Sequence, residues 1–335
     1  MHQGRAEAVT APVVLVTGAT GGIGAATVRA YAAKGSPVVL LARSTGLLSS
    51  LRDELVAGGA RALVTVADVV DADAVQRAFD AAVHEFGRVD VVVHTAAVIA
   101  YGRHDEVPAD VWDHVQRVNV TGTANVARSA MKVFQAQSSG SLVVIGSVLG
   151  QATVPFMGSY ATSKWAVRGL VRILQEEARE MPGVHVAIVN PGSIATPIYT
   201  LAGNYTTRIG RPPPPVMQPE AVARKVMHVV DKRKRMAGVN PSNLVIRAGF
   251  VLAPRLYDVI VGPMAKVACL RRQHVEPHSG HVFTPSEDVV VPAEGEVPWP
   301  GRTAPVTALH AGRPDADHAA RELVADAAGD GRRGT

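Results

Sequence analysis

Cysteine and aromatic residues are scarce in this 335-residue chain, and each scarcity narrows the choice of fold. The single cysteine, Cys269, cannot form an intrachain disulfide, so we expect a protein of a reducing, cytoplasmic compartment. Aromatic residues make up 4% of the chain, whereas hydrophobic residues make up 47%. A core of small aliphatic side chains suits alternating helices and strands better than a β-sandwich.

Long hydrophobic runs and a strong excess of one charge are also missing. No run of about 18 apolar residues occurs, and the opening MHQGRAEAVTAP lacks the apolar core of a signal peptide. We therefore expect neither a spanning helix nor a signal peptide. The net charge is +5, and the one dense basic cluster, DKRKR (231–235), closes a helix-like segment, where cations complement the helix dipole. Because the charge is not gathered on one face, no nucleic-acid partner is expected.

What the chain does contain is short runs of Val, Ile and Leu that alternate with stretches of helix length. Such near-continuous apolar runs predict strands covered on both faces of a parallel sheet. The segments between them, such as AATVRAYAAKG, carry apolar residues at helical spacing. We predict an α/β fold, a doubly wound parallel sheet (Rossmann fold) with helices on both faces. The predicted strands are VVLVTG, PVVLLAR, ALVTVAD, VDVVVHTA, GSLVVIGS and VHVAIVNPG.

The alternation weakens beyond the last of these runs. Residues 196–218 contain the run PPPP and predict an extended, loop-like segment, after which Pro219 predicts the start of a helix. The domain organisation we predict is a dinucleotide-binding and catalytic domain over 10–243, an apolar C-terminal extension over 244–272, and a Pro/Gly/His-rich, disordered tail over 273–335.

The apolar stretch 244–268 has two interpretations. It carries Arg247, Arg255, Asp258 and Lys266, so it is not a spanning segment. We favour a helix that packs over the substrate cleft or against a partner subunit. Peripheral contact with a membrane surface is the alternative, because arginine and lysine can reach past an apolar face to the lipid headgroups.

The stretch TGATGGIG (17–24) follows the first predicted strand and precedes a helix. A phosphate-binding turn needs residues without a Cβ, so that backbone amides can approach a pyrophosphate at the helix N-terminus. Two spacings fit such a turn. Gly18, Gly22 and Gly24 give GxxxGxG, whereas Gly18, Gly21 and Gly24 give GxxGxxG.

The second predicted strand ends with Arg43, followed by Ser44. A carboxylate at this place in dinucleotide-binding folds contacts the ribose of NAD, whereas arginine can hold the additional phosphate of NADP. A guanidinium is always charged and can grip phosphate with two hydrogen bonds. We therefore predict that NADP(H) is preferred to NAD(H).

Tyr160 and Lys164 lie in SYATSKWAVRGL, one helical turn apart. A free tyrosine has a pKa of about 10, and a nearby ammonium stabilises the phenolate and lowers that pKa. Ser147, at the end of the preceding strand, could hydrogen-bond a substrate oxygen. These residues predict acid–base chemistry at a carbonyl or an alcohol.

In order along the chain, TGATGGIG, VADVV, NVTG, Ser147, YATSK and NPGSIATP resemble the motifs of the short-chain dehydrogenase/reductase family over roughly residues 10–230. The resemblance implies that Tyr160 is the general acid/base and that Ser147 positions the carbonyl. Lys164 would hold the nicotinamide ribose and tune Tyr160, and Asn119 would support a water-linked proton relay. A homodimer or homotetramer is also implied. The implied cofactor contacts are Gly18, Thr20, Gly22, Ile23, Gly24, Arg43, Ser44, Asp68, Val69, Ala96, Tyr160, Lys164, Pro191, Gly192, Ile194 and Thr196.

One motif departs from the family's "classical" type. His94-Thr95-Ala96-Ala97 stands where that type usually has Asn-Asn-Ala-Gly, and it resembles the "extended" type, which acts on nucleotide sugars. HVAIVNPGSIATP and Arg43 fit the classical type, and the region after residue 245 lacks further alternating strands. We therefore assign the chain to the classical type and choose Gly18, Gly22 and Gly24 as the loop glycines.

The predicted function is NADP(H)-dependent interconversion of a carbonyl and a secondary alcohol on an apolar or bulky small molecule. The loop over residues 196–217, which contains no acid, would close over that substrate. The alternatives are a nucleotide-sugar epimerase or dehydratase, a non-catalytic NADP(H)-binding sensor or scaffold, and a membrane-surface protein. No metal is expected, because Pro277 and Gly280 interrupt the spacing of the only candidate ligands, Cys269, His274, His278 and His281.

Overall fold

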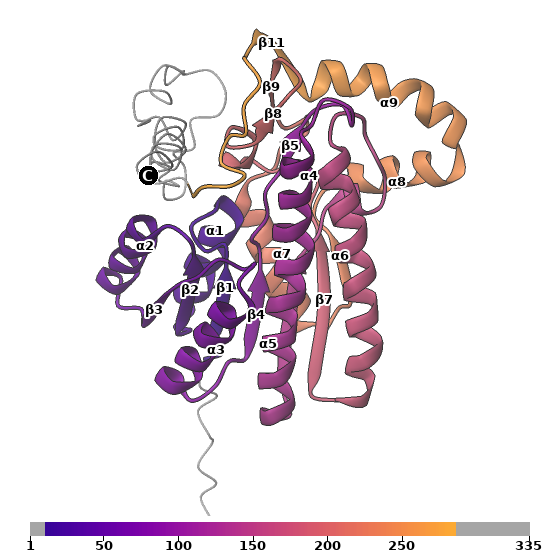
Figure 1. Ribbon diagram of the computed structural model, residues 1–335. Helices are drawn as coiled ribbons and strands as arrows, with labels where there is room; N and C mark the ends of the chain where they lie inside the picture. The colour runs from indigo at the N-terminus through magenta and orange to yellow at the C-terminus, as the bar shows by residue number, and fades with distance from the viewer. Residues whose placement is uncertain (1–10, 286–335) are drawn as a thin grey trace, which may run out of the picture. The chain divides into compact units, whose positions relative to one another are not determined.

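The computed structural model describes residues 11–285 and contains the predicted doubly wound sheet (Figure 1). Its strands lie in the order β10–β7–β6–β4–β1–β2–β3, and every adjacent pair is parallel. The strand order reverses between β1 and β4, which is where open α/β sheets bind their ligands. The strands are β1 (Val14–Thr17), β2 (Val38–Ala42), β3 (Ala62–Val66), β4 (Val91–His94), β6 (Gly140–Ile145), β7 (Val184–Asn190) and β10 (Met236–Gly238).

All six apolar runs identified in the sequence form strands of this sheet. Every residue of β1, β2, β4 and β7 is buried, as expected for strands covered on both faces. The edge strand β3 is only partly buried. The other edge strand, β10, is not among the predicted strands, because its three residues are too few to show a periodic pattern.

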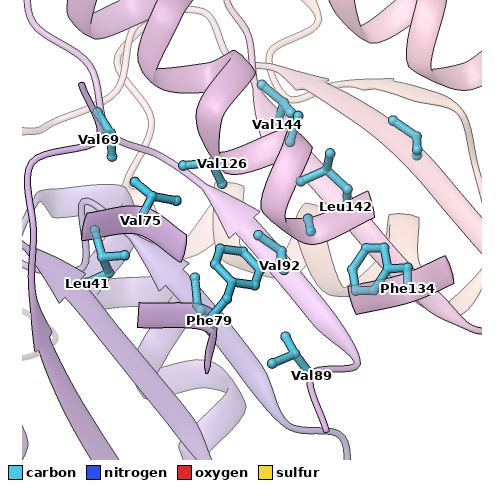
Figure 2. Packing of buried hydrophobic residues seen from close by; sticks show 14 of the residues in the cluster. Leu41, Val69, Val75, Phe79, Val89, Val92, Val126, Phe134, Leu142 and Val144 are labelled. Carbon is cyan, nitrogen blue, oxygen red and sulfur yellow. The ribbon is translucent and has the colours of Figure 1, made fainter. Parts of the chain in front are cut away.

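Helices cover both faces of the sheet. Alternate strand residues point to opposite faces, so Leu15 and Val92 join one core cluster while Val16 and Val93 join the other. Figure 2 shows the first cluster, where aromatic rings from the helices pack among strand residues. The helices of that face are α3 (Ala72–Phe86), α5 (Gly122–Gln137) and α6 (Gly158–Glu177), and those of the opposite face are α1 (Gly22–Ala32), α2 (Thr45–Ala57) and α7 (Pro219–Asp231).

The ends of the helices have local causes. Asp71 caps α3 by accepting hydrogen bonds from the backbone of Asp73 and Ala74, and Gly87 ends the helix with a φ of +78°. Pro219 opens α7 at the position where proline is tolerated. The helix expected to run through the basic cluster 231–235 ends at its first residue, and the chain then turns into β10.

The chain returns to the cleft side of the sheet after β10. Two consecutive helices, α8 (Ser242–Leu252) and α9 (Pro254–Ala268), lead into β11 (Leu270–His274), which pairs antiparallel with β9 (Arg208–Gly210). A second small pairing joins β5 (Ala100–Tyr101) to β8 (Gly203–Asn204). The predicted boundary at 272/273 falls inside β11, and most of the predicted tail lies outside the described residues. The domain limits stay predictions.

Candidate active site

Three glycines of the TGATGGIG loop occupy positions that admit no side chain. Gly18 has a φ of +66°, where side chains are strained. A Cβ on Gly22 would lie 2.6 Å from the side chain of Thr196, and a Cβ on Gly24 would overlap the carbonyl oxygen of Gly18. A Cβ on Gly21 would meet its nearest atom at 3.3 Å. The packing supports the spacing Gly18, Gly22, Gly24.

The same loop fits the phosphates of a dinucleotide. Helix α1 begins at the loop, with Gly21 as its N-cap, and has no acidic residue in its first turn. Its unpaired N–H groups and positive dipole end therefore favour an anion at this point. The cradle left by the missing Cβ atoms lets such a group approach the backbone closely.

A cleft of about 280 Å³ opens beside this loop, at the carboxyl ends of the central strands. It brings together residues from segments that are far apart in the chain, and Asn119 is the one predicted site residue that does not line it. The predicted residues that do are Gly18, Thr20, Gly22, Ile23, Gly24, Arg43, Ser44, Asp68, Val69, Ala96, Ser147, Tyr160, Lys164, Pro191, Gly192, Ile194 and Thr196.

A guanidinium and a carboxylate lie together at one end of the cleft. Arg43 Nη1 lies 3.7 Å from an oxygen of Asp68 and donates a hydrogen bond of 3.1 Å to the carbonyl oxygen of Phe283. Asp68 also accepts a hydrogen bond from the backbone of Val70 at 3.0 Å. Ser44 is the N-cap of α2. The Arg43 end of the cleft is thus polar and charged.

Tyr160, Ser147 and Lys164 meet at another part of the cleft. The Lys164 ammonium lies 5.5 Å from the centre of the Tyr160 ring, and it donates a hydrogen bond of 3.0 Å to the carbonyl oxygen of Ile145. Ser147, two residues after β6 ends at Ile145, hydrogen-bonds the side chain of Tyr160. The strand end and one turn of α6 therefore hold all three side chains in place.

Burial controls the titration of these groups. It raises the pKa of Tyr160 to about 12, against the opposing effect of the Ser147 hydrogen bond. Burial also lowers the pKa of Lys164 to about 8. The net shift for Tyr160 is opposite to the lowering expected from its spacing to Lys164, because the cost of removing a phenolate from water is the largest influence on this pKa. Tyr160 therefore carries its proton at neutral pH.

Asn119 lies behind the cleft in a π-helical turn, η1 (Arg117–Thr121), between α4 (Ala109–Gln116) and α5. Its side-chain amide exchanges two hydrogen bonds of 2.9 Å with the backbone of Val98 and donates a third to the hydroxyl of Ser163. It thus ties the loop after β4 to α6. The Thr123 hydroxyl donates to the Asn119 carbonyl oxygen at 2.5 Å.

His94, the residue that departs from the classical motif, is buried between two hydroxyls. Nδ1 lies 2.7 Å from the Thr17 hydroxyl and Nε2 lies 2.9 Å from the Thr123 hydroxyl. Because Thr123 gives its own proton to Asn119, we infer that His94 carries its proton on Nε2 and accepts from Thr17 on Nδ1. Burial, with a contribution from Lys164, lowers the pKa of His94 to about 3 and keeps the ring neutral. The histidine thus bridges β1, β4 and α5.

The lining beyond Tyr160 is largely apolar. Tyr199, in the short helix η4 (Pro197–Tyr199), is partly buried, packs in one cluster with Tyr160 and hydrogen-bonds Ser193. The charged residues among the lining are Arg43 and Asp68 at the far end, and Lys164. The apolar lining residues of this part are Val98, Ile99, Ile198, Leu201 and Ala202.

Among the cleft residues that sequence reasoning missed, one comes from the segment predicted to be a disordered tail. His281 lines it, and its backbone N–H donates to the carbonyl oxygen of Leu201 at 2.9 Å. The preceding Gly280 has a φ of +54°. No motif marks this segment, whose Pro/Gly/His composition resembles a disordered tail. Across residues 11–285, no group of three or more His, Cys, Asp or Glu side chains could hold a metal ion, and no helix is long and apolar enough to cross a membrane.

Comparisons with known proteins identify related oxidoreductases. A family model described as short chain dehydrogenase matches residues 12–204. The uncharacterized oxidoreductase YxnA of Bacillus subtilis is 30% identical over 280 residues, covering 82% of this chain and 75% of that protein. A 3-oxoacyl-(acyl-carrier-protein) reductase of Synechocystis is 34% identical over 190 residues, covering 56% of this chain and 76% of that protein.

Solved structures show the same similarity. A short-chain dehydrogenase/reductase of Burkholderia phymatum in complex with NAD has 26% identity and a TM-score of 0.66, covering 74% of this chain and 95% of that one. An alcohol dehydrogenase of Thermococcus sibiricus complexed with 5-hydroxy-NADP has 27% identity and a TM-score of 0.59, covering 68% of this chain and 94% of that one. This chain belongs to the short-chain dehydrogenase/reductase family, and it is an NAD(P)-dependent oxidoreductase.

Proposed function

We propose that the protein is an NADP(H)-dependent enzyme that interconverts a carbonyl and a secondary alcohol on an apolar or bulky small molecule, with Tyr160 as general acid/base. The observation that carries the proposal is the meeting of Tyr160, Ser147 and Lys164 in the cleft whose other end holds Arg43. A bound nicotinamide supplies or accepts the hydride.

Tyr160 handles the proton in this mechanism. In reduction, its hydroxyl gives a proton to the carbonyl oxygen as the carbon is reduced, which leaves an alcohol and a phenolate. A pKa of about 12 keeps that proton in place at neutral pH until it is needed. Ser147 hydrogen-bonds the same oxygen, and the Lys164 ammonium stabilises the phenolate that remains.

Arg43 supports the preference for NADP(H). Its guanidinium faces Asp68 at 3.7 Å and the carbonyl oxygen of Phe283 at 3.1 Å, so it is positioned by two oxygen atoms at the adenosine end of the cleft. A phosphate on the ribose would be a stronger acceptor than either of them. Asp68 contributes the adenine contact that the family resemblance implies.

The substrate class follows from the lining around Tyr160. Ile99, Ile198 and Leu201 offer apolar surface, and among the described lining residues of that part the only charge is Lys164. A small charged substrate would find no ion partner there other than Lys164, whereas an apolar one gains free energy by burial. The loop 196–217 that bears Ile198 and Leu201 is the predicted lid over this substrate.

The first test is NADPH oxidation against a panel of ketones, aldehydes, steroids and quinones. We expect Tyr160→Phe to lower kcat/KM for any active substrate by at least about 100-fold, because it removes the acid without changing the ring. Tyr257→Phe is the matched control, since the Tyr257 hydroxyl bonds the carbonyl oxygen of Thr153 outside the cleft. Equal activity of wild type and Tyr160→Phe would remove Tyr160 from the mechanism.

A second test concerns the cofactor. Arg43→Asp is expected to weaken NADPH binding by about 10- to 100-fold, the effect of losing a charge-assisted hydrogen bond, while NADH binding is retained or improved, because a carboxylate at this place can contact the ribose of NAD. Arg52→Asp on the neighbouring helix, away from the cleft, is the control. Unchanged NADPH affinity in Arg43→Asp, measured by fluorescence titration, would disprove the phosphate assignment.

The rival functions predict other outcomes. A nucleotide-sugar epimerase or dehydratase would retain NAD tightly through purification, and a sensor or scaffold would bind NADPH without turnover of any substrate in the panel. Between β10 and residue 285 the structure holds two helices and β11, with no further parallel strand, which favours the oxidoreductase over the nucleotide-sugar enzyme. The homo-oligomer and the cytoplasmic location stay predictions.

A further inference from the structure

Helices α8 and α9 both expose large apolar side chains. Leu252 is 81% exposed and Val259 is 72% exposed, whereas residues of this type are buried throughout the central strands. In Figure 1 the two helices project beside α6, away from the sheet. We name this set the α8–α9 apolar face; it comprises Leu244, Val245, Val251, Leu252, Leu256, Val259, Ile260, Met264 and Val267.

The exposed residues lie along one side of each helix. At about 100° per residue, those of α8 fall within an arc of about 120° and those of α9 within about 140°. The opposite side of α9 is occupied, because Val261 and Ala265 are buried against the body. Helix α8 is held by Phe250, whose ring lies 6.2 Å from Trp165 and 5.4 Å from Tyr257. Each helix thus packs against the body with one side and exposes an apolar stripe on another.

The charges of the two helices are arranged asymmetrically around these stripes. Arg255 and Lys266 both project at the same edge of the α9 stripe, and Arg247 stands beside the α8 stripe. The only acidic residue of the two helices, Asp258, lies on the side of α9 away from the stripe centre. All four side chains are exposed. An aliphatic band with cations at its edge is complementary to an anionic, apolar surface.

The apolar face is linked to the substrate end of the cleft. Arg211 in the lid donates hydrogen bonds to the carbonyl oxygens of Val267 and Ala268 at 2.7 and 3.0 Å. The next strand, β11, pairs with β9 of the lid, and its Leu270 packs in one cluster with Tyr199. A surface that binds α9 would therefore lie close to the lid and to the apolar, substrate end of the cleft.

We propose that the α8–α9 apolar face adsorbs to an anionic phospholipid bilayer, in the plane of the headgroups. The alternative occupant is a second copy of this chain, and the composition of the face argues against it. Protein interfaces are anchored mainly by Trp, Tyr and Arg and carry regular hydrogen bonds. This face has nine aliphatic side chains, no aromatic side chain and no hydrogen-bonding group. The edge cations Arg255 and Lys266 also find no acidic partner beside the stripe of a second copy, because Asp258 lies away from it, whereas anionic lipids neutralise them.

Flotation of the full chain with vesicles tests the proposal. We expect binding to vesicles of phosphatidylcholine with phosphatidylglycerol, and at least 10-fold weaker partitioning for the triple variant Leu256→Ser/Val259→Ser/Val267→Ser. The control is Val56→Ser/Val66→Ser, because these valines are 52% and 53% exposed elsewhere on the molecule. Thermal melts verify that each variant folds. Absence of flotation by the wild type, or equal flotation of the triple variant, would overturn the proposal.

The charge requirement is tested separately. Arg255→Gln/Lys266→Gln should lower partitioning several-fold, and Lys232→Gln/Lys234→Gln, which removes the same charge after α7, should not. Equal binding to vesicles of phosphatidylcholine alone would contradict the anionic requirement. A wild-type dimer by light scattering that becomes monomeric in the triple-serine variant, without flotation, would assign the face to a second copy. None of these measurements depends on turnover, so they stand apart from the tests of the proposed function.

Discussion

The strands of the sheet and the helices of the C-terminal extension are both rich in Val and Leu, but the strands bury these side chains and the helices expose many of them. β1 and β2 read VLVT and VVLLA and are buried at every position, whereas α8 and α9 carry Leu and Val side chains that are more than half exposed. The strands are buried because helices cover both faces of the sheet. The extension packs against the body on one side. An apolar sequence therefore predicts burial only where the fold supplies a second layer.

The polar groups of the two regions differ in the same way. In the doubly wound region, a chain of hydrogen bonds joins buried polar side chains from Thr17 through His94 and Thr123 to Asn119. This chain lies behind the cleft and ties together the elements around it. In α8 and α9 the charged side chains are exposed to water, where a charge contributes little to fixing a site. We therefore assign the proposed reaction to the doubly wound region and the proposed membrane contact to the C-terminal extension.

The largest expected difference between the regions is in the response to truncated leucines. Leu15→Ala, in the fully buried core, should lower the free energy of unfolding by about 2–5 kcal/mol through lost burial and an unfilled cavity. Leu256→Ala, in the exposed stripe of α9, should change it by less than about 0.5 kcal/mol. Urea unfolding measures both. A loss above about 2 kcal/mol for Leu256→Ala would show that another part of the protein covers the stripe in solution.

Two helical glycines give a smaller contrast. Gly24→Ala in α1 places a Cβ against the carbonyl oxygen of Gly18, so it should destabilise the protein by about 1–3 kcal/mol and weaken NADPH binding. Gly249→Ala in α8 meets only the ring of Tyr257, at 3.4 Å, and should stabilise by about 0.5–1 kcal/mol, since alanine is the better helix former. Thermal melts and NADPH titration of the pair measure both effects. Full NADPH affinity in Gly24→Ala would mean that the loop does not hold the phosphates as proposed.

How much the sequence predicts differs between the regions for a physical reason. The six apolar runs between residues 13 and 192 have the length and continuity of buried strands, and the motif residues follow those strands, so parallel pairing brings them to one edge. Arg43, Ser147 and Tyr160 could therefore be assigned to one cleft from the sequence alone. The two loop spacings differ in Gly21 and Gly22, and packing favours Gly22, because an added Cβ would lie 3.3 Å from its nearest atom at Gly21 but 2.6 Å from the Thr196 side chain at Gly22.

What the sequence does not predict is set by contacts between distant segments. β10 has three residues and acquires its structure from pairing with β7, and His281 reaches the cleft because its segment forms backbone hydrogen bonds with Leu201 and Asn204. The shift of the Tyr160 pKa likewise depends on burial, which no spacing to Lys164 reveals. The stretch 244–268 reads as a single helix, whereas it forms two, α8 and α9; its packing against a partner subunit stays a prediction.

The pH dependence of stability isolates His94, the residue at which the chain departs from the classical motif. Its pKa is about 3 in the folded protein against an ordinary value of 6.5, so between these values the unfolded chain binds one more proton. Stability from this group is fully present above pH 6.5 and is lost as the pH falls toward 3, by at most about 1.4 kcal/mol per pH unit. His94→Asn keeps a donor and an acceptor but does not titrate, so its free energy of unfolding should fall less steeply with acid. Urea unfolding of both proteins from about pH 7 to about pH 4.5 gives the two slopes. Parallel slopes would mean that His94 accepts a proton as easily in the folded protein as in the unfolded chain, and that the bridge between Thr17 and Thr123 is not formed.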